Sequence, residues 1–316
     1  MSETILQIHN LTKFFPTRKG LLHAVDGVTL SLEQGKTLGV VGESGCGKST
    51  LGRTIMRLIE PTSGEIYFEN VDITKLKGRA LTAFRKNIQM IFQDPFSSLD
   101  TRKTVAQIIA EPIQIHKLAK DKADLERQTR ELMDTVGLAR RWYASYPHQL
   151  DGGRRQRIGI ARALALGPKL LICDEPVSAL DVSIQAQILN LLKELQEEKG
   201  LSCIFITHDL SVVYNFSDDI AVMYLGKLVE KAPSEELFKN PLHPYTKALL
   251  SAIPIPDINQ EKKRIILEGE VVSPVNLPDV CRFKKRCNMK CEKCNNSEPS
   301  LKEVSPGHFV ACWLKE

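Results

Sequence analysis

A glycine-rich segment early in the chain has the residue types and spacing of a phosphate-binding loop. It has the sequence Gly42-Glu-Ser-Gly-Cys-Gly-Lys-Ser49, which matches the pattern G-x-x-x-x-G-K-[ST]. A buried strand is predicted before it and a helix after it, which is the context that this pattern requires. Glycines permit a tight turn whose N–H groups point at phosphate oxygens, and the helix adds its positive dipole end. The segment therefore predicts a nucleotide-phosphate site.

Two carboxylates later in the chain supply the complementary chemistry. The apolar run Leu170–Cys173 ends in Asp174 and Glu175, at a strand end where such sheets bind ligands. We expect Asp174 to hold Mg²⁺ through water and Glu175 to polarise an attacking water. In the glycine-rich loop, Lys48 is placed for the β- and γ-phosphates and the Ser49 hydroxyl for Mg²⁺.

Four further motifs follow the order found in ATP-binding cassette proteins, and with the first two they resemble that family over residues 5–232. They are Gln93 in Ile91-Phe-Gln-Asp-Pro95, Leu150-Asp-Gly-Gly-Arg-Arg-Gln-Arg157, Ser178-Ala-Leu-Asp181, and His208 in Ile206-Thr-His-Asp209. The resemblance implies a Q-loop at Gln93, which also contacts Mg²⁺, a D-loop at Asp181 and a switch histidine at His208. It thus implies catalysis by Glu175, His208 and Gln93.

The resemblance also assigns the ATP contacts. Those within one chain are Phe15, Gly42, Ser44, Gly45, Cys46, Gly47, Lys48, Ser49 and Thr50; those offered to a partner's ATP are Leu150, Asp151, Gly152, Gly153 and Arg154. Phe15 sits where the family stacks an aromatic ring on adenine, although a plain core phenylalanine fits an edge strand equally well. Taken singly, His208 fits a non-reactive histidine and Gln93 an ordinary loop amide.

The signature departs from the family pattern, which has Ser in place of Asp151 and usually Gln in place of Arg154. In the family the signature of one cassette touches the γ-phosphate bound by another. A carboxylate there repels that phosphate by about 4 kcal/mol at ~4 Å and an effective dielectric near 20. Unless Asp151 is protonated or Arg154 compensates, one of two sites in a heterodimer would hydrolyse ATP poorly. The alternative is a tolerated substitution, because Asp still caps a helix.

Cysteines and basic residues gather at the C-terminal end. Residues 281–316 hold five of the eight cysteines, together with 8 Lys and Arg against 4 Asp and Glu. Clustered cysteines predict metal ligands, and a basic segment fits a nucleic-acid or lipid patch. The spacing Cys281-x5-Cys287-x6-Cys294-x17-Cys312, with Cys291 in addition, is not a two-knuckle zinc pattern.

This tail resembles the extension of peptide-importer cassettes, which binds an iron–sulfur cluster through four cysteines. The resemblance implies a [4Fe–4S] cluster on Cys281, Cys287, Cys294 and Cys312, and the segment 240–250 matches the same subfamily. Zn²⁺ on the four thiols, reduced free thiols, and Cys291 in place of Cys294 are alternatives. Nearby basic side chains would offset the cluster charge, namely Arg282, Lys284, Lys285, Arg286, Lys290 and Lys293.

Strand-like and helix-like segments alternate over the first 230 residues and predict an α/β fold with a mostly parallel sheet. The resemblance implies a P-loop NTPase cassette: a mixed sheet, an antiparallel β subdomain, an inserted helical subdomain and a small Cys-rich C-terminal domain. We expect residues 1–94 and 168–232 to form the ATP-binding core, 95–167 the helical insertion and 233–316 the extension.

Composition limits where such a protein can act. The 316 residues are 42% hydrophobic and 26% charged, with a net charge of +5, which excludes a disordered or fibrous chain. No run of about 18 apolar residues and no secretory signal is found. The prediction is a peripheral protein on the cytoplasmic face of the membrane.

The resemblance as a whole implies the ATPase subunit of a di- or oligopeptide importer. Its partners would be a second cassette subunit in a heterodimer, two transmembrane permeases and an extracytoplasmic binding protein, with no nucleic acid. Nickel or oligosaccharide cargo is an alternative within the subfamily. Rival hypotheses are a non-transport cassette acting on DNA or the ribosome, and a tail that serves as a redox or nucleic-acid module.

Overall fold

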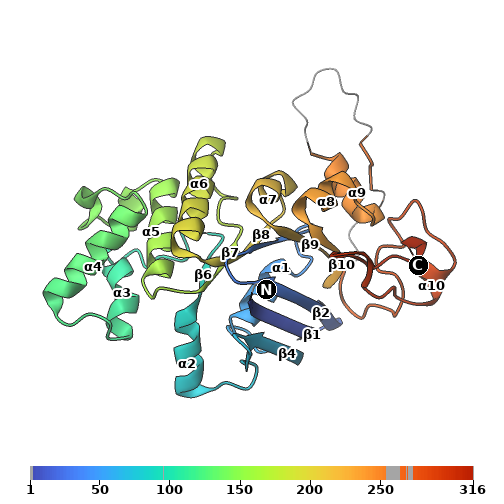
Figure 1. Cartoon of the computed structure of the whole chain (residues 1–316), viewed down its shortest axis with the longest axis horizontal. Helices are drawn as coiled ribbons and strands as arrows, with labels where there is room; N and C mark the ends of the chain where they lie inside the picture. Colours follow the sequence, from blue (N-terminus) through green and yellow to red (C-terminus); the bar gives the residue numbers. More distant parts are fainter. Residues whose placement is uncertain (1–2, 95, 254–263, 268, 270–272, 316) are drawn as a thin grey trace. The chain divides into compact units, whose positions relative to one another are not determined.

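The computed structural model describes residues 3–94, 96–253, 264–267, 269 and 273–315 (Figure 1). These residues belong to two structural units: Met1–Lys75 with Phe205–Glu316, and Leu76–Ile204. The chain passes from the second unit back to the first within strand β8 (Ser202–Thr207). The subdomain boundaries given above remain a prediction.

The first unit begins with an antiparallel sheet, visible at the blue end of the chain in Figure 1. Its strands, in order across the sheet, are β2 (Gly20–Glu33), β1 (Thr4–Thr17), β4 (Ser63–Phe68) and β5 (Val71–Asp72). Leu6 and Ile8 of β1 are fully buried, because alternate side chains of a strand point to the same face. The sheet thus has one face committed to the core.

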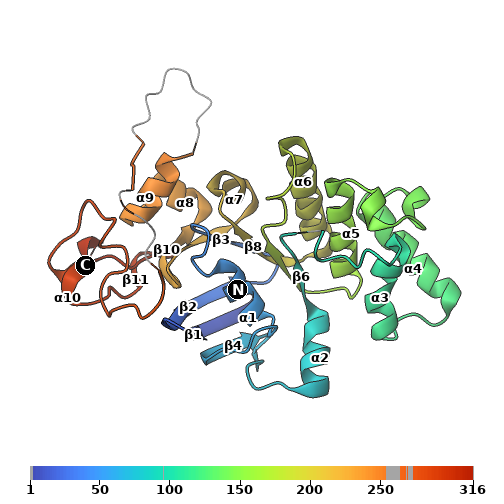
Figure 2. The same ribbon diagram turned by 180° about the vertical axis from the view of Figure 1, so that it is seen from behind.

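A second set of strands in this unit is mixed in direction. Strand β3 (Thr37–Val41) is buried along its whole length and pairs in parallel with β9 (Asp219–Tyr224). From β9 the pairing continues antiparallel through β10 (Lys227–Pro233) and β12 (His308–Val310) to β11 (Lys302–Ser305), as Figure 2 shows from behind. The C-terminal strands therefore extend the sheet of the unit that carries the glycine-rich loop.

The helices of the first unit are short. They are α1 (Lys48–Ile55), α7 (Leu210–Phe216), α8 (Ser234–Lys239), α9 (Pro244–Ser251) and α10 (Lys293–Asn296). The sequence predicts that α1 continues to Ile59, but the helix ends at Ile55 because Arg57 adopts a left-handed conformation at φ 57°. Its guanidinium then donates to the carbonyl of Ile73.

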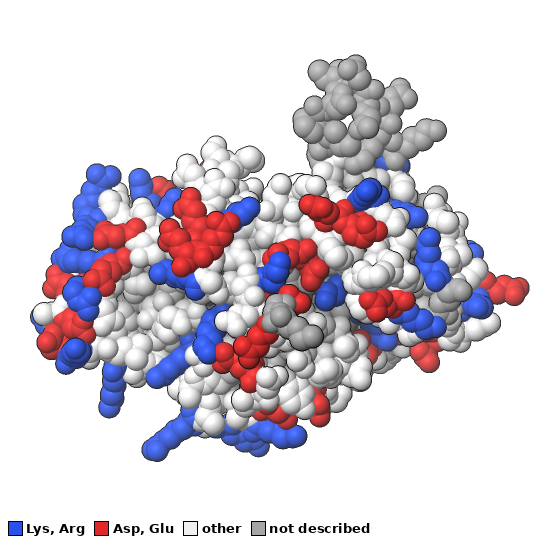
Figure 3. Space-filling view, in the orientation of Figure 1, with Lys and Arg blue, Asp and Glu red and all other residues white. Residues whose placement is uncertain are grey.

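The second unit is mainly helical, with a pair of parallel strands. Its elements are α2 (Gly78–Asn87), β6 (Ile88–Ile91), α3 (Val105–Ile115), α4 (Lys122–Thr135), α5 (Gly152–Leu164), β7 (Leu170–Asp174) and α6 (Val182–Lys199). The Arg127 and Arg130 side chains of α4 pair with acidic residues three or four positions away, so that blue and red alternate on this helical part in Figure 3. This face is a solvated one.

The mixed α/β architecture predicted from the sequence is confirmed, with three additions. Helix α2, helix α7 and the pair β9–β10 lie outside the segments predicted from periodicity. Strand β9 follows α7 after two residues, Ser217 and Asp218, and such a short apolar run lacks a clear period of its own.

Candidate functional site

The glycine-rich loop joins β3 to α1, and close backbone packing determines its glycines. Gly42, Gly45 and Gly47 have φ values of 152°, 78° and 106°, which L side chains rarely adopt. A Cβ on Gly42 would lie 2.2 Å from the carbonyl oxygen of Met223, and one on Gly47 would lie 1.9 Å from that of Ala24. A Cβ on Gly45 would meet nothing within 4 Å, so the loop is open to a ligand at that point.

Lys48 is the first residue of α1 and lies folded inside the loop. It is 4% exposed, and its Nζ donates to the carbonyl oxygens of Gly42 at 2.7 Å and Glu43 at 3.0 Å. Gly47 is the N-cap residue and provides no side-chain cap, so the first turn of α1 keeps N–H groups for an anion. Ser49 and Thr50 lie in this turn. The donor set fits a polyphosphate.

Two other predicted ATP contacts belong to the same unit. Phe15 lies in β1 with an intermediate exposure, and the Nζ of Lys13 lies 4.8 Å from the centre of its ring. The ring is therefore not a buried core residue. Cys46 is 4% exposed, and burial raises the pKa of its thiol, so it contributes to the loop as a small apolar side chain.

His208 is exposed at the end of β8, directly before α7. Asp209, the next residue, caps α7 by accepting a hydrogen bond from the N–H of Ser211 at 2.9 Å. The strand and the capped helix hold the backbone on both sides of the histidine. Its side chain is thus presented to solvent from a fixed position.

In the second unit the structure brings Gln93 and Glu175 together. Strands β6 and β7 pair in parallel, so the residues that follow them lie at the same edge. The Nε2 of Gln93 donates to Glu175 Oε2 at 2.9 Å. Glu175 has φ 47°, an unusual backbone conformation for a glutamate, and such conformations cluster at functional sites. Asp174, which ends β7, is fully buried.

The signature residues begin helix α5. Asp151 is its N-cap residue, accepting a hydrogen bond from the N–H of Arg154 at 2.8 Å. The Arg154 guanidinium also forms an ion pair with the Asp151 carboxylate at 2.5 Å and lies 5.1 Å from the ring centre of Trp142. The charge of Asp151 is therefore balanced by its own helix, which is the compensation left open by the sequence.

The signature glycines also have a packing role within the second unit. A Cβ on Gly153 would lie 2.6 Å from Ile184 of α6, and one on Gly152 would lie 3.0 Å from Leu180. Leu150, just before them, is 4% exposed. Asp181, assigned to the D-loop, is the exposed N-cap residue of α6. These contacts join α5 closely to the start of α6.

The cysteines of the tail lie near one another in the first unit. The Sγ atoms of Cys291 and Cys294 are 3.6 Å apart, and the N–H of Cys281 donates to the carbonyl of Cys294. Burial raises the pKa of Cys281 to about 12, and the neighbouring thiols of Cys294, Cys287 and Cys312 contribute to the rise. Within the described residues, no group of three or more His, Cys, Asp or Glu side chains is arranged to hold a metal ion.

Two arginines of the tail do not act as free counter-charges for a cluster. Arg282 pairs with Asp26 and Glu298, and Arg286 pairs with Glu43 of the glycine-rich loop. The expectation that all the neighbouring basic residues offset a metal cluster is therefore wrong for these two. The contact between Arg286 and Glu43 joins positions 243 residues apart, and no local pattern in the sequence indicates it.

Comparison with known proteins matches this arrangement. The model of the family described as "ABC transporter" matches residues 25–178, and that of the "Oligopeptide/dipeptide transporter, C-terminal region" matches residues 229–294. The oligopeptide transport ATP-binding proteins AppF and OppF of Bacillus subtilis are each 52% identical to this chain. The AppF alignment covers 99% of this chain and 98% of AppF; the OppF alignment covers 99% and 97%.

Among solved structures, a dimeric ATP-binding cassette in a post-hydrolysis state with bound ADP and Pi is similar at a TM-score of 0.67. It is 30% identical, over 72% of this chain and 98% of that one. The chain therefore belongs to the ABC transporter family and has its P-loop NTPase cassette fold. It is an ABC-type ATPase whose relatives of about 50% identity are peptide transport ATP-binding proteins. None of the described helices combines the length and apolar composition needed to cross a membrane.

Proposed function

We propose that this chain is the ATP-hydrolysing subunit of a di- or oligopeptide importer. The observation that carries the proposal is the match to oligopeptide transport ATP-binding proteins over almost the entire chain, tail included. Its partners are a second cassette subunit, two transmembrane permeases and an extracytoplasmic binding protein, and the chain lies peripherally at the cytoplasmic face. A non-transport cassette would have no use for a peptide-transporter C-terminal region.

The test is uptake of labelled di- and oligopeptides by cells that lack the gene, with and without the gene restored. Restoration of peptide uptake supports the proposal. Restoration of nickel or oligosaccharide uptake alone would assign a different cargo of the same subfamily. Co-purification with DNA or ribosomes, in place of permeases, would contradict the transport role.

ATP and Mg²⁺ fit the two sets of residues described above. Lys48 and the first turn of α1 would bind the β- and γ-phosphates, and the open position at Gly45 leaves room for them. Ser49, Gln93 and Asp174 would hold Mg²⁺, and Phe15 would stack on adenine. Bound Mg²⁺ offsets the negative charge of the phosphates during their transfer.

Hydrolysis is assigned to Glu175, supported by Gln93 and His208. Glu175 would orient and polarise the attacking water as a general base. The hydrogen bond from Gln93 holds one oxygen of this carboxylate, so that a change at Gln93 is felt directly at the base. His208 would stabilise the charge that develops on the transferred phosphoryl group, and Asp181 would contact the partner cassette.

The signature is proposed to remain competent despite Asp151. The ion pair with Arg154 removes most of the repulsion that a lone carboxylate would exert on the partner's γ-phosphate. ATPase of the assembled complex should therefore change little for Asp151→Ser and fall for Arg154→Met. A large gain of activity in Asp151→Ser would favour the alternative, a heterodimer with one weak site.

The tail is proposed to bind a metal through Cys281, Cys287, Cys294 and Cys312, as a [4Fe–4S] cluster or, alternatively, Zn²⁺. The support is the gathering of these thiols, which raise one another's pKa. Thiolates are the ligands, so metal binding must release protons from these cysteines. Anaerobic purification followed by iron, sulfide and zinc analysis separates the two, and absence of all three would refute the proposal.

A further inference from the structure

Glu43, the second residue of the glycine-rich loop, holds the inside of the loop together through its carbonyl group. This oxygen accepts hydrogen bonds from the Nζ of Lys48 at 3.0 Å and from the N–H of Cys46 at 3.3 Å. Lys48 thus depends on the position of Glu43 for one of its anchors. A shift of Glu43 would move the lysine that is assigned to the phosphates.

The C-terminal region holds the same residue from outside the loop. The N–H of Glu43 donates to the hydroxyl of Tyr245 in α9 at 2.9 Å. Its carboxylate accepts two hydrogen bonds from the guanidinium of Arg286, at 2.7 Å and 3.0 Å. Two-point arginine–carboxylate pairs fix orientation as well as distance. Every polar group of Glu43 therefore has a partner, and two of those partners lie beyond residue 240.

These two anchors rest on a packed aromatic cluster. Tyr245 is fully buried, with its ring centre 4.8 Å from that of Tyr224 and 5.5 Å from that of Phe283. Phe283 is 2% exposed, and its carbonyl accepts a hydrogen bond from the N–H of Arg286 at 2.9 Å. The Arg286 side chain is 8% exposed, against 27% for Glu43. The arginine is therefore a fixed part of the core and not a mobile surface side chain.

We propose that Arg286 is a positioning residue for ATP binding: it neutralises and orients Glu43, so that the Cys-rich tail keeps the glycine-rich loop receptive to a triphosphate. The inference rests on the proposed binding of ATP by this loop. Without the guanidinium, a carboxylate of the loop faces the same anion as Lys48. The repulsion between like charges then opposes nucleotide binding. Arg286 reaches no phosphate itself and acts through Glu43.

The test is the Kd for a fluorescent ATP analogue in the full-length chain. Arg286→Met should raise this Kd about tenfold, because it leaves the Glu43 charge uncompensated beside the phosphates. Glu43→Gln should lower it about threefold, because the arginine charge then acts on the nucleotide alone. The double variant Arg286→Met/Glu43→Gln should return to within about threefold of the original Kd, since neither charge remains.

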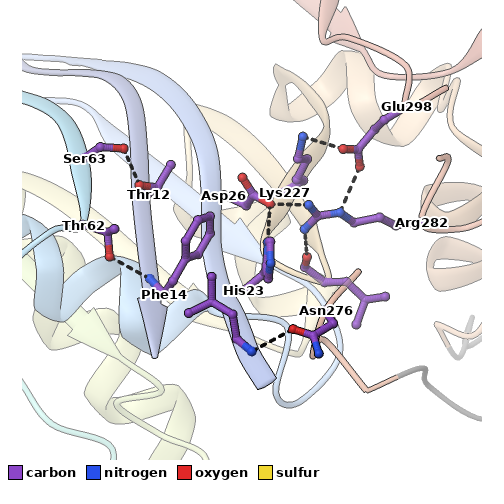
Figure 4. A network of polar contacts seen from close by, with 12 residues as sticks. Thr12, Phe14, His23, Asp26, Thr62, Ser63, Lys227, Asn276, Arg282 and Glu298 are labelled. Atoms are coloured by element: carbon purple, nitrogen blue, oxygen red, sulfur yellow. Dashed lines mark hydrogen bonds and ion pairs between the residues drawn. The ribbon is translucent and has the colours of Figure 1, made fainter. Parts of the chain in front are cut away.

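Arg282→Met is the matched control. Arg282 belongs to the same tail, is 7% exposed and forms its own buried ion pairs, but it pairs with Asp26 and Glu298 and not with the loop (Figure 4). Its Kd for the nucleotide should change less than about twofold in a folded sample. An equal rise in Kd for Arg282→Met would show that the tail acts only by being docked, which would overturn the proposal.

Three other outcomes also decide it. An unchanged Kd in Arg286→Met, or a double variant as weak as Arg286→Met alone, would overturn the role assigned to the charge. If Arg286→Met fails to fold, Glu43→Gln alone decides, and a Kd that does not fall contradicts the proposal. If the original chain binds no nucleotide, it is the proposed function, and not this inference, that fails.

Discussion

At the scale of single residues, the hydrolytic assignment concentrates on Glu175. Its left-handed backbone and its hydrogen bond from Gln93 hold the carboxylate in one orientation at the end of β7. A base fixed in this way contributes to the reaction step and little to substrate affinity. Binding and hydrolysis should therefore separate on mutation.

Glu175→Gln should lower the kcat for ATP hydrolysis by about 10²- to 10³-fold, because the amide cannot accept a proton from water. The Kd for ATP should stay within about threefold. Steady-state hydrolysis and nucleotide titration of the same preparation measure both. Gln93→Ala, which removes only the group that orients the base, should cost about tenfold in kcat; a larger loss than in Glu175→Gln would contradict the assignment.

A buried histidine makes stability depend on pH. His243 is 2% exposed, its Nδ1 accepts from the N–H of Tyr245 at 3.1 Å, and burial lowers its pKa to about 3. The unfolded chain takes up a proton near pH 6.5 while the folded chain does not. Its contribution to stability is thus complete above pH 6.5 and is lost as the pH falls from 6.5 towards 3.

By pH 5 this histidine should reduce the free energy of unfolding by about 2 kcal/mol relative to pH 7. His243→Asn keeps a helix-capping acceptor but does not titrate, so its stability should fall less over the same range. Urea unfolding at pH 7 and pH 5 measures the difference. Equal losses in both proteins would show that other groups cause the acid sensitivity.

At the scale of elements, the start of α5 combines a cap and a charge pair. Asp151 satisfies the N–H of Arg154 and pairs with its guanidinium, while Gly152 and Gly153 allow close packing against residues 180–184. The signature is therefore both a presented surface and a helix start. Effects on stability and on activity must be measured separately there.

Asp151→Ala should destabilise the chain by about 1 kcal/mol, because it removes the cap of α5. Asp151→Ser retains a capping oxygen and should cost less than half of that. Chemical unfolding compares the two, with Asp121→Ala, which removes the cap of α4, as a matched control of similar expected size. No difference between Ala and Ser would show that the cap does not stabilise α5.

At the scale of the whole chain, the C-terminal extension is joined to the first unit by long-range polar contacts. Figure 4 shows Arg282 between Asp26 of β2 and Glu298, with Lys227 and His23 completing the network. Burial opposes ionisation of Asp26, but the hydrogen bonds from His23 and Arg282 lower its pKa. Asn276 adds a bond from the N–H of Leu21 at 2.8 Å.

Arg282→Met should lower the free energy of unfolding by about 3 kcal/mol, since it leaves two largely buried carboxylates short of a counter-charge. Lys227→Met is the control, because Lys227 is 31% exposed and its pair with Glu298 should be worth under about 1 kcal/mol. Denaturant unfolding of both variants measures the costs. Similar small costs for the two would mean that the network does not hold the extension.

Local patterns predicted much of the cassette. The buried strands β3 and β7, the helices α3 to α6 and the glycine-rich loop follow from runs and periods within a few residues. What they could not predict were contacts between distant segments: the compensation of Asp151 by an arginine stacked on Trp142, or the strands β11 and β12 that extend β10. Such contacts depend on which surfaces meet, and a single sequence does not encode that in any local period.

The sequence by itself determined the chemistry: a lysine, a hydroxyl and two carboxylates at the ends of buried strands, in the order of an ATPase cassette, followed by a cluster of thiols. The tertiary structure alone decided how the tail is used. Its arginines are not spread around a thiol cluster; two of them are buried against Glu43 and against Asp26 and Glu298. The reason is physical, because a buried guanidinium needs a carboxylate within hydrogen-bonding distance, and only folding brings those residues together.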